Sequence, residues 1–271
     1  MNRIDQRFAE LKAEGASAFV PFLVAGDPTL ERSEEIAVAL AQNGADVIEL
    51  GVPFSDPIGD GAVIQESAQR ALKHRVHLTQ IFESARRIRQ QTDCALLLFT
   101  YYNPLLAYGI ERLAKAGADA GIDGVLCVDL PAEEAEDYRK TLSAHGLSTV
   151  FLVAPTTSDA RLAVIAEQCT GFVYYVSRLG VTGERAELST NLDSALARIR
   201  SFTDKPIAVG FGIGTPEQAE KVAGLAEGVV VGSAIVRLIG QLGDQPGTAQ
   251  KVGAFAGALA EAAKRGKIPA G

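Results

Sequence analysis

Cysteine is scarce in this sequence, and its distribution argues against a disulfide-stapled fold. The chain contains three cysteines, Cys94, Cys127 and Cys169, and each lies in or beside an apolar run. An odd number of dispersed cysteines fits reduced, buried thiols in a cytoplasmic protein, because disulfide frameworks belong to oxidising compartments. We expect none of the three to act as a nucleophile or as a metal ligand.

Long apolar runs and concentrated charge are also missing. No uninterrupted apolar run reaches about 18 residues, and residues 1–14 lack a signal-peptide pattern, so we expect a soluble protein that is not exported. The 26 basic and 33 acidic residues give a net charge of −7 without a basic cluster. Nucleic acid and anionic membranes are therefore not expected partners, and an anionic substrate would need a local site.

Short apolar runs recur along the chain and alternate with segments of helical spacing. The apolar runs predict strands at 18–24, 47–50, 95–101, 124–129, 148–153, 171–176, 206–210 and 228–232. Helical spacing occurs at about 3–13, 29–42, 78–91, 108–117, 132–145, 158–168, 190–201, 216–225 and 246–265. This alternation indicates a parallel sheet, and its eight units predict a single (β/α)8 barrel domain over 1–271. A doubly wound open sheet is the alternative.

Two segments depart from the simple alternation. The predicted helix at 3–13 precedes the first strand, and we expect it to cover one end of the barrel as an extra N-terminal helix. The interval 52–94 is the only long one between strands, and we expect it to hold an active-site loop and an extra helical turn. The helix after the seventh strand has the clearest start, because Thr215 and Gln218 form a capping box around Pro216.

The strand at 47–50 carries an acidic residue, Glu49, to its own C-terminal end, and the following loop returns a second one, Asp60, between two glycines. Active sites of such barrels lie at the C-terminal ends of the strands. Strand alternation places Val47, Glu49 and Gly51 on one side. If that side is the barrel interior, burial raises the pKa of Glu49 and suits it to acid–base catalysis near neutral pH. A structural glutamate paired with a buried cation is the alternative.

Glycine clusters follow the last two strands. Residues 210–214 precede a capped helix, and Gly232 and Ser233 begin another short helix directly after the eighth strand. Free backbone N–H groups at helix N-termini bind anions, and the loops after strands seven and eight of barrels often hold phosphate. We therefore expect a phosphorylated substrate, with simple turn formation as the alternative reading of the glycines.

Two more features follow strand ends. The polar loop 177–185 is hinged by glycines and is long enough to close over a ligand, although it could equally be a plain connection. Four aromatic residues near strand C-terminal ends could line a pocket, namely Phe22, Tyr102, Tyr174 and Phe211.

Several catalytic groups are missing from the strand ends. All nine lysines lie in predicted helices, turns or approaches to strand N-termini, which disfavours Schiff-base chemistry. His74, His77 and His145 lie outside the strand ends and have no carboxylate or cysteine at metal-ligand spacing, which disfavours a catalytic metal. Cofactor-free acid–base catalysis by carboxylates is what remains.

A set of motifs, in chain order, resembles the tryptophan synthase α subunit family. The matching residues are Pro21-Phe22, Gly26-Asp27-Pro28, the block from Glu49 to Pro57 with Asp60-Gly61, Tyr101-Tyr102-Asn103-Pro104, Ser177-Arg178, Gly180-Val181-Thr182-Gly183, Gly210-Phe211-Gly212-Ile213 and Val231-Gly232-Ser233-Ala234. The resemblance implies a (β/α)8 barrel that cleaves indole-3-glycerol phosphate to indole and glyceraldehyde 3-phosphate by a retro-aldol reaction.

The resemblance also implies residue roles. Glu49 would protonate the indole ring carbon and help remove the glycerol hydroxyl proton, while an ionised Asp60 would stabilise positive charge on the indole nitrogen. The indole pocket would comprise Phe22, Thr100, Tyr102, Tyr174 and Phe211, with Thr182 meeting the catalytic aspartate from the closing loop. Phosphate would be held by Gly183, Gly212, Gly232 and Ser233.

A partner chain is implied as well. Family members dock on a β subunit that carries pyridoxal phosphate and receives indole through a tunnel, in an α2β2 assembly. The contact surface would include Pro53, Asp56, Pro57 and Asn103, and the α chain itself would need no cofactor and no metal.

Two residues depart from the family pattern. Gly59 stands where alanine is more usual, and Leu179 is bulky for the closing loop, so the kinetics of the loops are open. Three alternatives also stay open: a free-standing lyase that releases indole, a related phosphate-binding isomerase, and a weakly catalytic chain that mainly regulates a partner. The role of Asp129, a further carboxylate at a strand end, is undecided.

Overall fold

Eight parallel strands form a closed barrel in the computed structural model. The structure describes residues 2–177, 185–210 and 212–266, and for 185–191 it describes the backbone only. Each strand pairs with its neighbour in sequence, and the first pairs with the last. The strands are β1 (Ala18–Val24), β2 (Val47–Gly51), β3 (Ala95–Thr100), β4 (Gly124–Cys127), β5 (Ser148–Val153), β6 (Val173–Val176), β7 (Ile207–Gly210) and β8 (Gly228–Val231). The predicted (β/α)8 barrel is confirmed.

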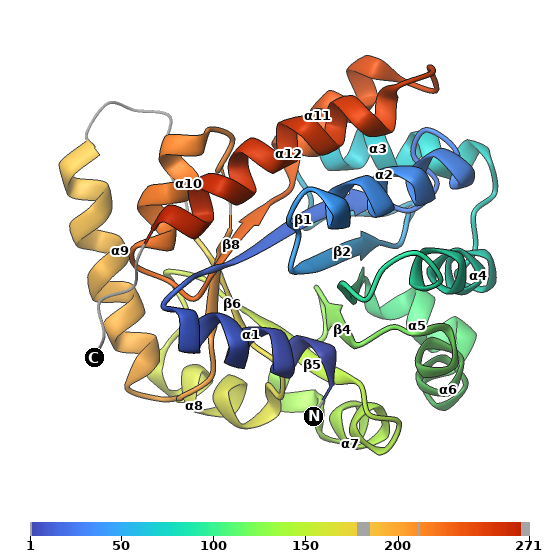
Figure 1. Cartoon of the computed structure of the whole chain (residues 1–271). Helices are drawn as coiled ribbons and strands as arrows, with labels where there is room; N and C mark the ends of the chain where they lie inside the picture. The colour runs from blue at the N-terminus through green and yellow to red at the C-terminus, as the bar shows by residue number, and fades with distance from the viewer. Residues whose placement is uncertain (1, 178–184, 211, 267–271) are drawn as a thin grey trace.

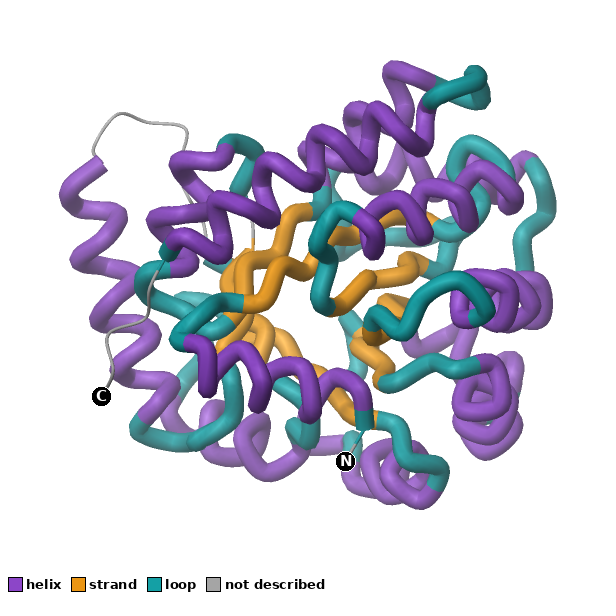
Figure 2. Tube along the Cα trace, in the orientation of Figure 1, coloured by secondary structure: helices purple, strands orange, loops and turns teal. Residues whose placement is uncertain are grey.

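Helices surround the barrel on its outside, as the purple tube around the orange strands shows in Figure 2. They are α1 (Arg3–Glu14), α2 (Leu30–Gln42), α3 (Ala62–Lys73), α4 (Leu78–Arg89), α5 (Tyr102–Tyr108), α6 (Ile110–Ala120), α7 (Glu136–Ala144), α8 (Asp159–Gln168), α9 (Arg185–Arg200), α10 (Pro216–Ala223), α11 (Ser233–Leu242) and α12 (Thr248–Arg265), with a 3-10 turn at Ala132–Glu134.

The extra N-terminal helix, α1, closes one end of the barrel. It crosses the strands in Figure 1, and its buried residues Ile4, Phe8 and Leu11 join one apolar cluster with interior strand residues such as Val47 and Leu97. Two ion pairs hold the helix there: Arg7 to Asp46 at 2.7 Å and Arg3 to Asp123 at 3.1 Å. Because these contacts lie at the N-terminal ends of the strands, the opposite end is the open one.

The same two aspartates also bond to neighbouring strands. Asp46 accepts the backbone N–H of Phe19 at 2.7 Å, and Asp123 accepts that of Leu96 at 2.9 Å. Both carboxylates are almost fully buried, at 4% and 3% exposure. Charge-assisted hydrogen bonds of this kind satisfy a buried charge and fix the register of adjacent strands.

The interval 52–94 holds more structure than the single extra turn we expected. It contains two complete helices, α3 and α4. We placed α4 correctly but missed α3, whose N-cap is Gly61 and has no side-chain hydrogen bond to mark the start. A second expectation, a helix at 108–117, is corrected to α5 and α6, which meet at Gly109 with φ of 91°. The capping box at Thr215 is confirmed.

No helix in the described part of the chain is both long enough and apolar enough to cross a membrane.

Candidate active site

Glu49 lies inside the barrel near the C-terminal end of β2. It is 1% exposed and pairs in register with Phe22 of β1 and Leu97 of β3. Among the described residues, no arginine or lysine acts on its charge and its Oε1 has no hydrogen-bond partner. Burial alone raises its pKa well above the ordinary value. The alternative of a structural glutamate paired with a buried cation is therefore not supported.

An apolar wall surrounds the Glu49 side of the barrel. Phe22 is 5% exposed and meets Phe99 edge-on, with ring centroids 5.2 Å apart. Tyr174 of β6 is 8% exposed, and the Glu49 charge acts on its phenol. Phe22 and Tyr174 are thus buried on the Glu49 side of the barrel, and their place in an indole pocket stays a prediction, whereas Phe99 was missed. Strand alternation from Leu97 would have identified Phe99, because residues 97 and 99 share a face.

Asp60 lies in the loop between β2 and α3 and is half-buried. Its backbone is held by two hydrogen bonds: Asp60 N–H donates to Pro57 at 3.0 Å, and Gln65 donates to the Asp60 carbonyl at 2.8 Å. Burial raises the pKa of the carboxyl, and a hydrogen bond with Tyr101 works against this rise. The net direction is upward, and the ionised state that the resemblance implies for Asp60 stays a prediction.

Thr100 and Tyr102 flank the end of β3 in different settings. Thr100 pairs with Cys127, on the face that packs against the helices, and its hydroxyl donates to the Tyr101 carbonyl at 3.1 Å. It is thus on the opposite face of β3 from Phe99, and its place in an indole pocket stays a prediction. Tyr102 begins α5, where Asp129 accepts its backbone N–H at 2.6 Å. Asp129 therefore accepts a hydrogen bond at the N-terminus of α5, a structural role that could not be assigned from the sequence.

Helix α11 presents an uncapped N-terminus directly after β8. Gly232 is its N-cap and has no side-chain hydrogen bond, and Ser233 is exposed in the first turn. In helix α10, in contrast, a capping box satisfies two of the free N–H groups: the Thr215 side chain accepts from the Gln218 N–H, and the Gln218 side chain accepts from the Thr215 N–H. Gly212 is exposed after β7, with φ of 83°. Free N–H groups at a helix N-terminus suit an anion, so α11 is the better of the two helices for a phosphate.

Three predicted site residues, Thr182, Gly183 and Phe211, lie outside the described residues, as do Arg178, Leu179 and Gly180 of the expected closing loop.

The predicted partner surface surrounds the open end of the barrel. Pro53 is buried, Pro57 is half-buried, and Asp56 and Asn103 are exposed. Two large apolar side chains nearby are also exposed: Ile58 at 89% in the same loop as Pro57, and Leu106 at 58% on α5. The sequence analysis missed both of them. Exposed aliphatic residues beside polar ones are typical of a protein-binding surface.

The three cysteines belong to the layer between strands and helices: Cys94 and Cys169 precede β3 and β6, and Cys127 ends β4. Cys94, Cys127 and Cys169 are free thiols, and burial raises the pKa of Cys94 and of Cys169 to about 12, which disfavours thiolate chemistry. Across 2–177, 185–210 and 212–266, no group of three or more His, Cys, Asp or Glu side chains is arranged to hold a metal ion.

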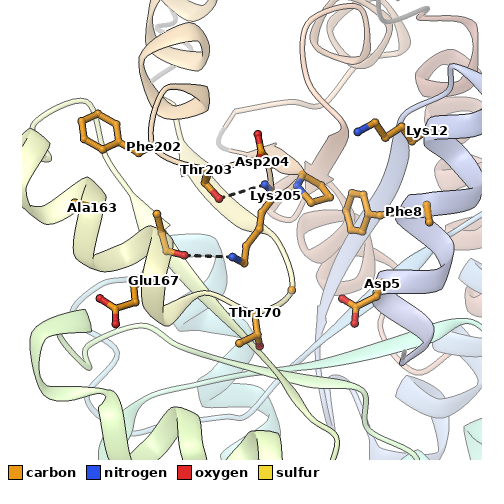
Figure 3. Close-up of a pocket in the computed structure, with 14 residues that line it drawn as sticks. Asp5, Phe8, Lys12, Ala163, Glu167, Thr170, Phe202, Thr203, Asp204 and Lys205 are labelled. Atoms are coloured by element: carbon orange, nitrogen blue, oxygen red, sulfur yellow. Dashed lines mark hydrogen bonds between the residues drawn. The ribbon is translucent and has the colours of Figure 1, made fainter. Parts of the chain in front are cut away.

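A cavity of about 760 Å³ lies at the closed end, between α1 and α8. Figure 3 shows Phe8 and Lys12 from α1, Glu167 from α8 and Lys205 from the segment before β7. The Lys205 ammonium donates to the Ala166 carbonyl at 3.3 Å. Because the cavity adjoins the N-terminal ends of β6 and β7, it is remote from Glu49 and is not the candidate active site.

Comparisons with known proteins agree with this geometry. The family model described as tryptophan synthase alpha chain matches residues 8–264. The alpha chain of Solibacter usitatus is 51% identical over 241 residues, covering 89% of this chain and 90% of that protein. The alpha chain of Geobacter sulfurreducens is 47% identical over 262 residues, covering 97% and 99%. The crystal structure of the alpha subunit from Legionella pneumophila superposes with a TM-score of 0.89 at 36% identity, covering 97% of this chain and 98% of that one. The chain belongs to the tryptophan synthase alpha chain family.

Proposed function

We propose that this chain is an enzyme that cleaves indole-3-glycerol phosphate to indole and glyceraldehyde 3-phosphate. The observation that carries the proposal is Glu49, a carboxyl buried at the C-terminal end of a barrel strand with no cation beside it in the part of the chain that the structure describes. Family membership indicates the substrate, and burial raises the pKa of Glu49, which favours a carboxyl that can donate a proton.

Glu49 acts first as an acid and then as a base. The protonated carboxyl delivers its proton to the ring carbon that carries the glycerol chain, and positive charge develops on the indole nitrogen. The Glu49 carboxylate then removes the proton of the glycerol hydroxyl next to the ring. As the carbon–carbon bond breaks, its electron pair returns to the ring, indole leaves, and the former hydroxyl carbon becomes the aldehyde of glyceraldehyde 3-phosphate. Glu49 ends the cycle protonated.

Asp60 stabilises the charge that develops in this cycle. An ionised carboxylate facing the indole nitrogen favours the transition state over the uncharged substrate. Burial raises the Asp60 pKa, and the hydrogen bond with Tyr101 acts in the opposite direction, in favour of the ionised form. The apolar wall of Phe22 and Tyr174, together with Thr100, Tyr102, Thr182 and Phe211, would hold the indole.

The phosphate of the substrate binds at the opposite side of the open end. The uncapped N-terminus of α11 offers N–H groups at Gly232 and Ser233, and exposed Gly212 allows a close approach. Gly183 would complete the phosphate site. A binding site that holds phosphate and indole at its two ends fixes the bond between them beside Glu49.

The enzyme works with a tryptophan synthase β subunit. We propose an α2β2 assembly in which Pro53, Asp56, Pro57 and Asn103 contact that subunit, with Ile58 and Leu106 adding apolar area, and in which indole passes directly to it. Pyridoxal phosphate would belong to the partner, and this chain would need no cofactor. The free thiols agree with a cytoplasmic location.

Indole release from indole-3-glycerol phosphate, with and without a β subunit, tests the proposal. We expect slow release by the chain alone and strong stimulation by the partner. Glu49→Gln should lower kcat by at least about a thousandfold with the fold intact, while the surface control Glu111→Gln should leave it unchanged. Near-normal turnover of Glu49→Gln would overturn the acid–base assignment, and fast release that ignores the β subunit would favour a free-standing lyase.

A further inference from the structure

Tyr101 connects the Asp60 loop to the barrel. Its hydroxyl accepts the backbone N–H of Gly59 at 3.0 Å, directly before Asp60. Its ring packs on Phe54 of the same loop, with centroids 5.2 Å apart and planes at 31°. Tyr101 is 3% exposed. It therefore contacts the loop from the buried side, at Phe54 and at Gly59, while much of the loop between them is exposed to solvent.

The Tyr101 hydroxyl also acts on the Asp60 carboxyl, whose pKa it lowers as a hydrogen-bond donor. A phenol that accepts one hydrogen bond still has its own O–H to donate, and an ionised carboxylate can only accept. The Gly59 N–H donates to the hydroxyl oxygen, so the phenolic hydrogen remains available to donate to the Asp60 carboxylate. The phenol therefore bridges the backbone before Asp60 and the side chain of Asp60 itself.

The anchor at the base of Tyr101 is rigid. Tyr101 is the N-cap residue of α5, directly after β3. On either side, the Thr100 carbonyl accepts the N–H of Val128 at 2.9 Å, and Asp129 accepts the N–H of Tyr102 at 2.6 Å. Groups fixed to a strand end hold a catalytic loop more accurately than contacts made within the loop.

Gly59 is the residue that permits this approach. A Cβ at position 59 would lie 3.1 Å from the Tyr101 hydroxyl and 3.0 Å from Val128 Cγ1. Either contact is tighter than ordinary packing, so an alanine would press on the phenol that holds the loop. The glycine at position 59 therefore lies in direct contact with the phenol that holds the loop.

We propose that Tyr101 is a positioning residue for catalysis, which holds Asp60 toward the substrate by bonding at once to its carboxylate and to the preceding Gly59 N–H. The inference rests on the proposed function, because it gives Asp60 a role in indole-3-glycerol phosphate cleavage. A hydrogen bond to the ionised form also keeps the pKa of Asp60 lower than burial alone would set it.

Tyr101→Phe is the decisive variant, because it keeps the ring on Phe54 and removes only the hydroxyl. We expect kcat for indole release to fall on the order of tenfold, with KM changed by less than about threefold, since the loss affects a charge in the transition state. The acidic limb of the kcat profile should shift to higher pH, because Asp60 then ionises less readily.

The matched control is Tyr138→Phe, which removes a buried hydroxyl on α7 that has no hydrogen-bond partner among the described residues. It should change neither kcat nor the pH limb.

Two further measurements separate positioning from a merely structural role. Adding Tyr101→Phe to Asp60→Asn should cost less than about twofold more in kcat, because residues that act through one another are not additive. Phe54→Leu, which keeps the phenol and the Asp60 carboxyl but removes the ring that packs on Tyr101, should lower kcat in the same direction as Tyr101→Phe and provides the test if Tyr101→Phe does not fold.

Three outcomes would overturn the positioning role: a Tyr101→Phe enzyme with wild-type kcat and pH profile, a full additional loss on the Asp60→Asn background, or an unaffected Phe54→Leu enzyme where Tyr101→Phe cannot be measured. A wild-type chain that releases no indole even with the β subunit would instead overturn the proposed function. The two failures are therefore distinguishable in one assay.

Discussion

Arg70 donates to both carboxylate oxygens of Asp27, from Nε and Nη2 at 2.8 Å each. The pair joins the turn after β1 to α3, and the Ser67 hydroxyl adds a third hydrogen bond to the same carboxylate. Gly240 of α11 lies against the guanidinium, because a Cβ there would be 2.9 Å from Arg70 Nη2. One ion pair therefore fixes α3, which follows the Asp60 loop, against α11, which begins at the candidate phosphate site.

Removal of this arginine should destabilise the protein. Arg70→Met leaves Asp27, which is 1% exposed, as a buried carboxylate without a counter-charge. We expect the free energy of unfolding in urea to fall by about 2–4 kcal/mol. The control is Arg161→Met, which breaks an exposed pair with Glu133 and should cost less than about 1 kcal/mol. Equal losses in the two variants would contradict the structural role of Asp27.

Gly210→Ala should disturb the pocket beside Glu49. An added Cβ would lie 2.9 Å from both Cε1 and Cζ of Tyr174, inside a buried strand. We expect a loss of about 1–3 kcal/mol in stability and weaker substrate binding, since the tyrosine must move. Gly224→Ala is the matched control, because its nearest neighbour would be 3.6 Å away. Thermal unfolding and KM measure the two effects, and a Gly210→Ala enzyme equal to wild type in both would refute the prediction.

Glu49→Gln should stabilise the protein in a pH-dependent manner. Burial raises the folded-state pKa of Glu49 above the ordinary value of 4.5, so the folded state binds this proton more tightly than the unfolded state. The wild-type chain therefore loses stability as pH rises from about 4.5 toward the folded-state pKa, and glutamine removes that loss. We expect the advantage of Glu49→Gln in urea unfolding to be small at pH 4.5 and larger at pH 7–8, by about 0.5–2 kcal/mol. A difference that does not change with pH would argue against a buried, readily protonated carboxyl.

Asp123→Ala should weaken the closed end of the barrel. The carboxylate accepts from Arg3, Arg89 and the N–H of Leu96, so its loss leaves a half-buried guanidinium and a strand N–H without their acceptor. We expect a loss of about 3–5 kcal/mol in urea unfolding. Asp119→Ala, which breaks an exposed pair with Lys115 on α6, should change stability by less than about 0.5 kcal/mol. Similar values for the two would show that the Asp123 network contributes little.

The fold was largely predictable because its signals are local. Apolar runs alternate with amphipathic segments, so the strands and the barrel follow from periodicity, and Glu49 is visible as an acid inside an apolar run. Helix α3 was missed because Gly61 provides no side-chain cap. Helix α5 was missed because its first three residues, Tyr102, Asn103 and Pro104, obscure its short apolar face.

The contacts across the site were not predictable in the same way. The bond from Gly59 to Tyr101 joins residues 42 positions apart, and nothing in either segment marks it. The upward pKa direction of Asp60 likewise depends on how the loop packs, which periodicity does not encode. The role of Asp129 became clear only when the start of α5 was located beside it.

Closure of the barrel by β1 and β8 has a consequence for synthesis of the chain. Ala18 pairs with Gly228 and Pro21 with Val231. One edge of the first strand therefore cannot pair until residues about 210 positions downstream have been synthesised. At ordinary translation rates this delay lasts roughly 10–40 s. During that time the backbone N–H and C=O groups on one edge of an apolar strand stay unpaired on the ribosome. The nascent chain therefore passes through a stage at which chaperone binding to residues 18–24 competes directly with aggregation.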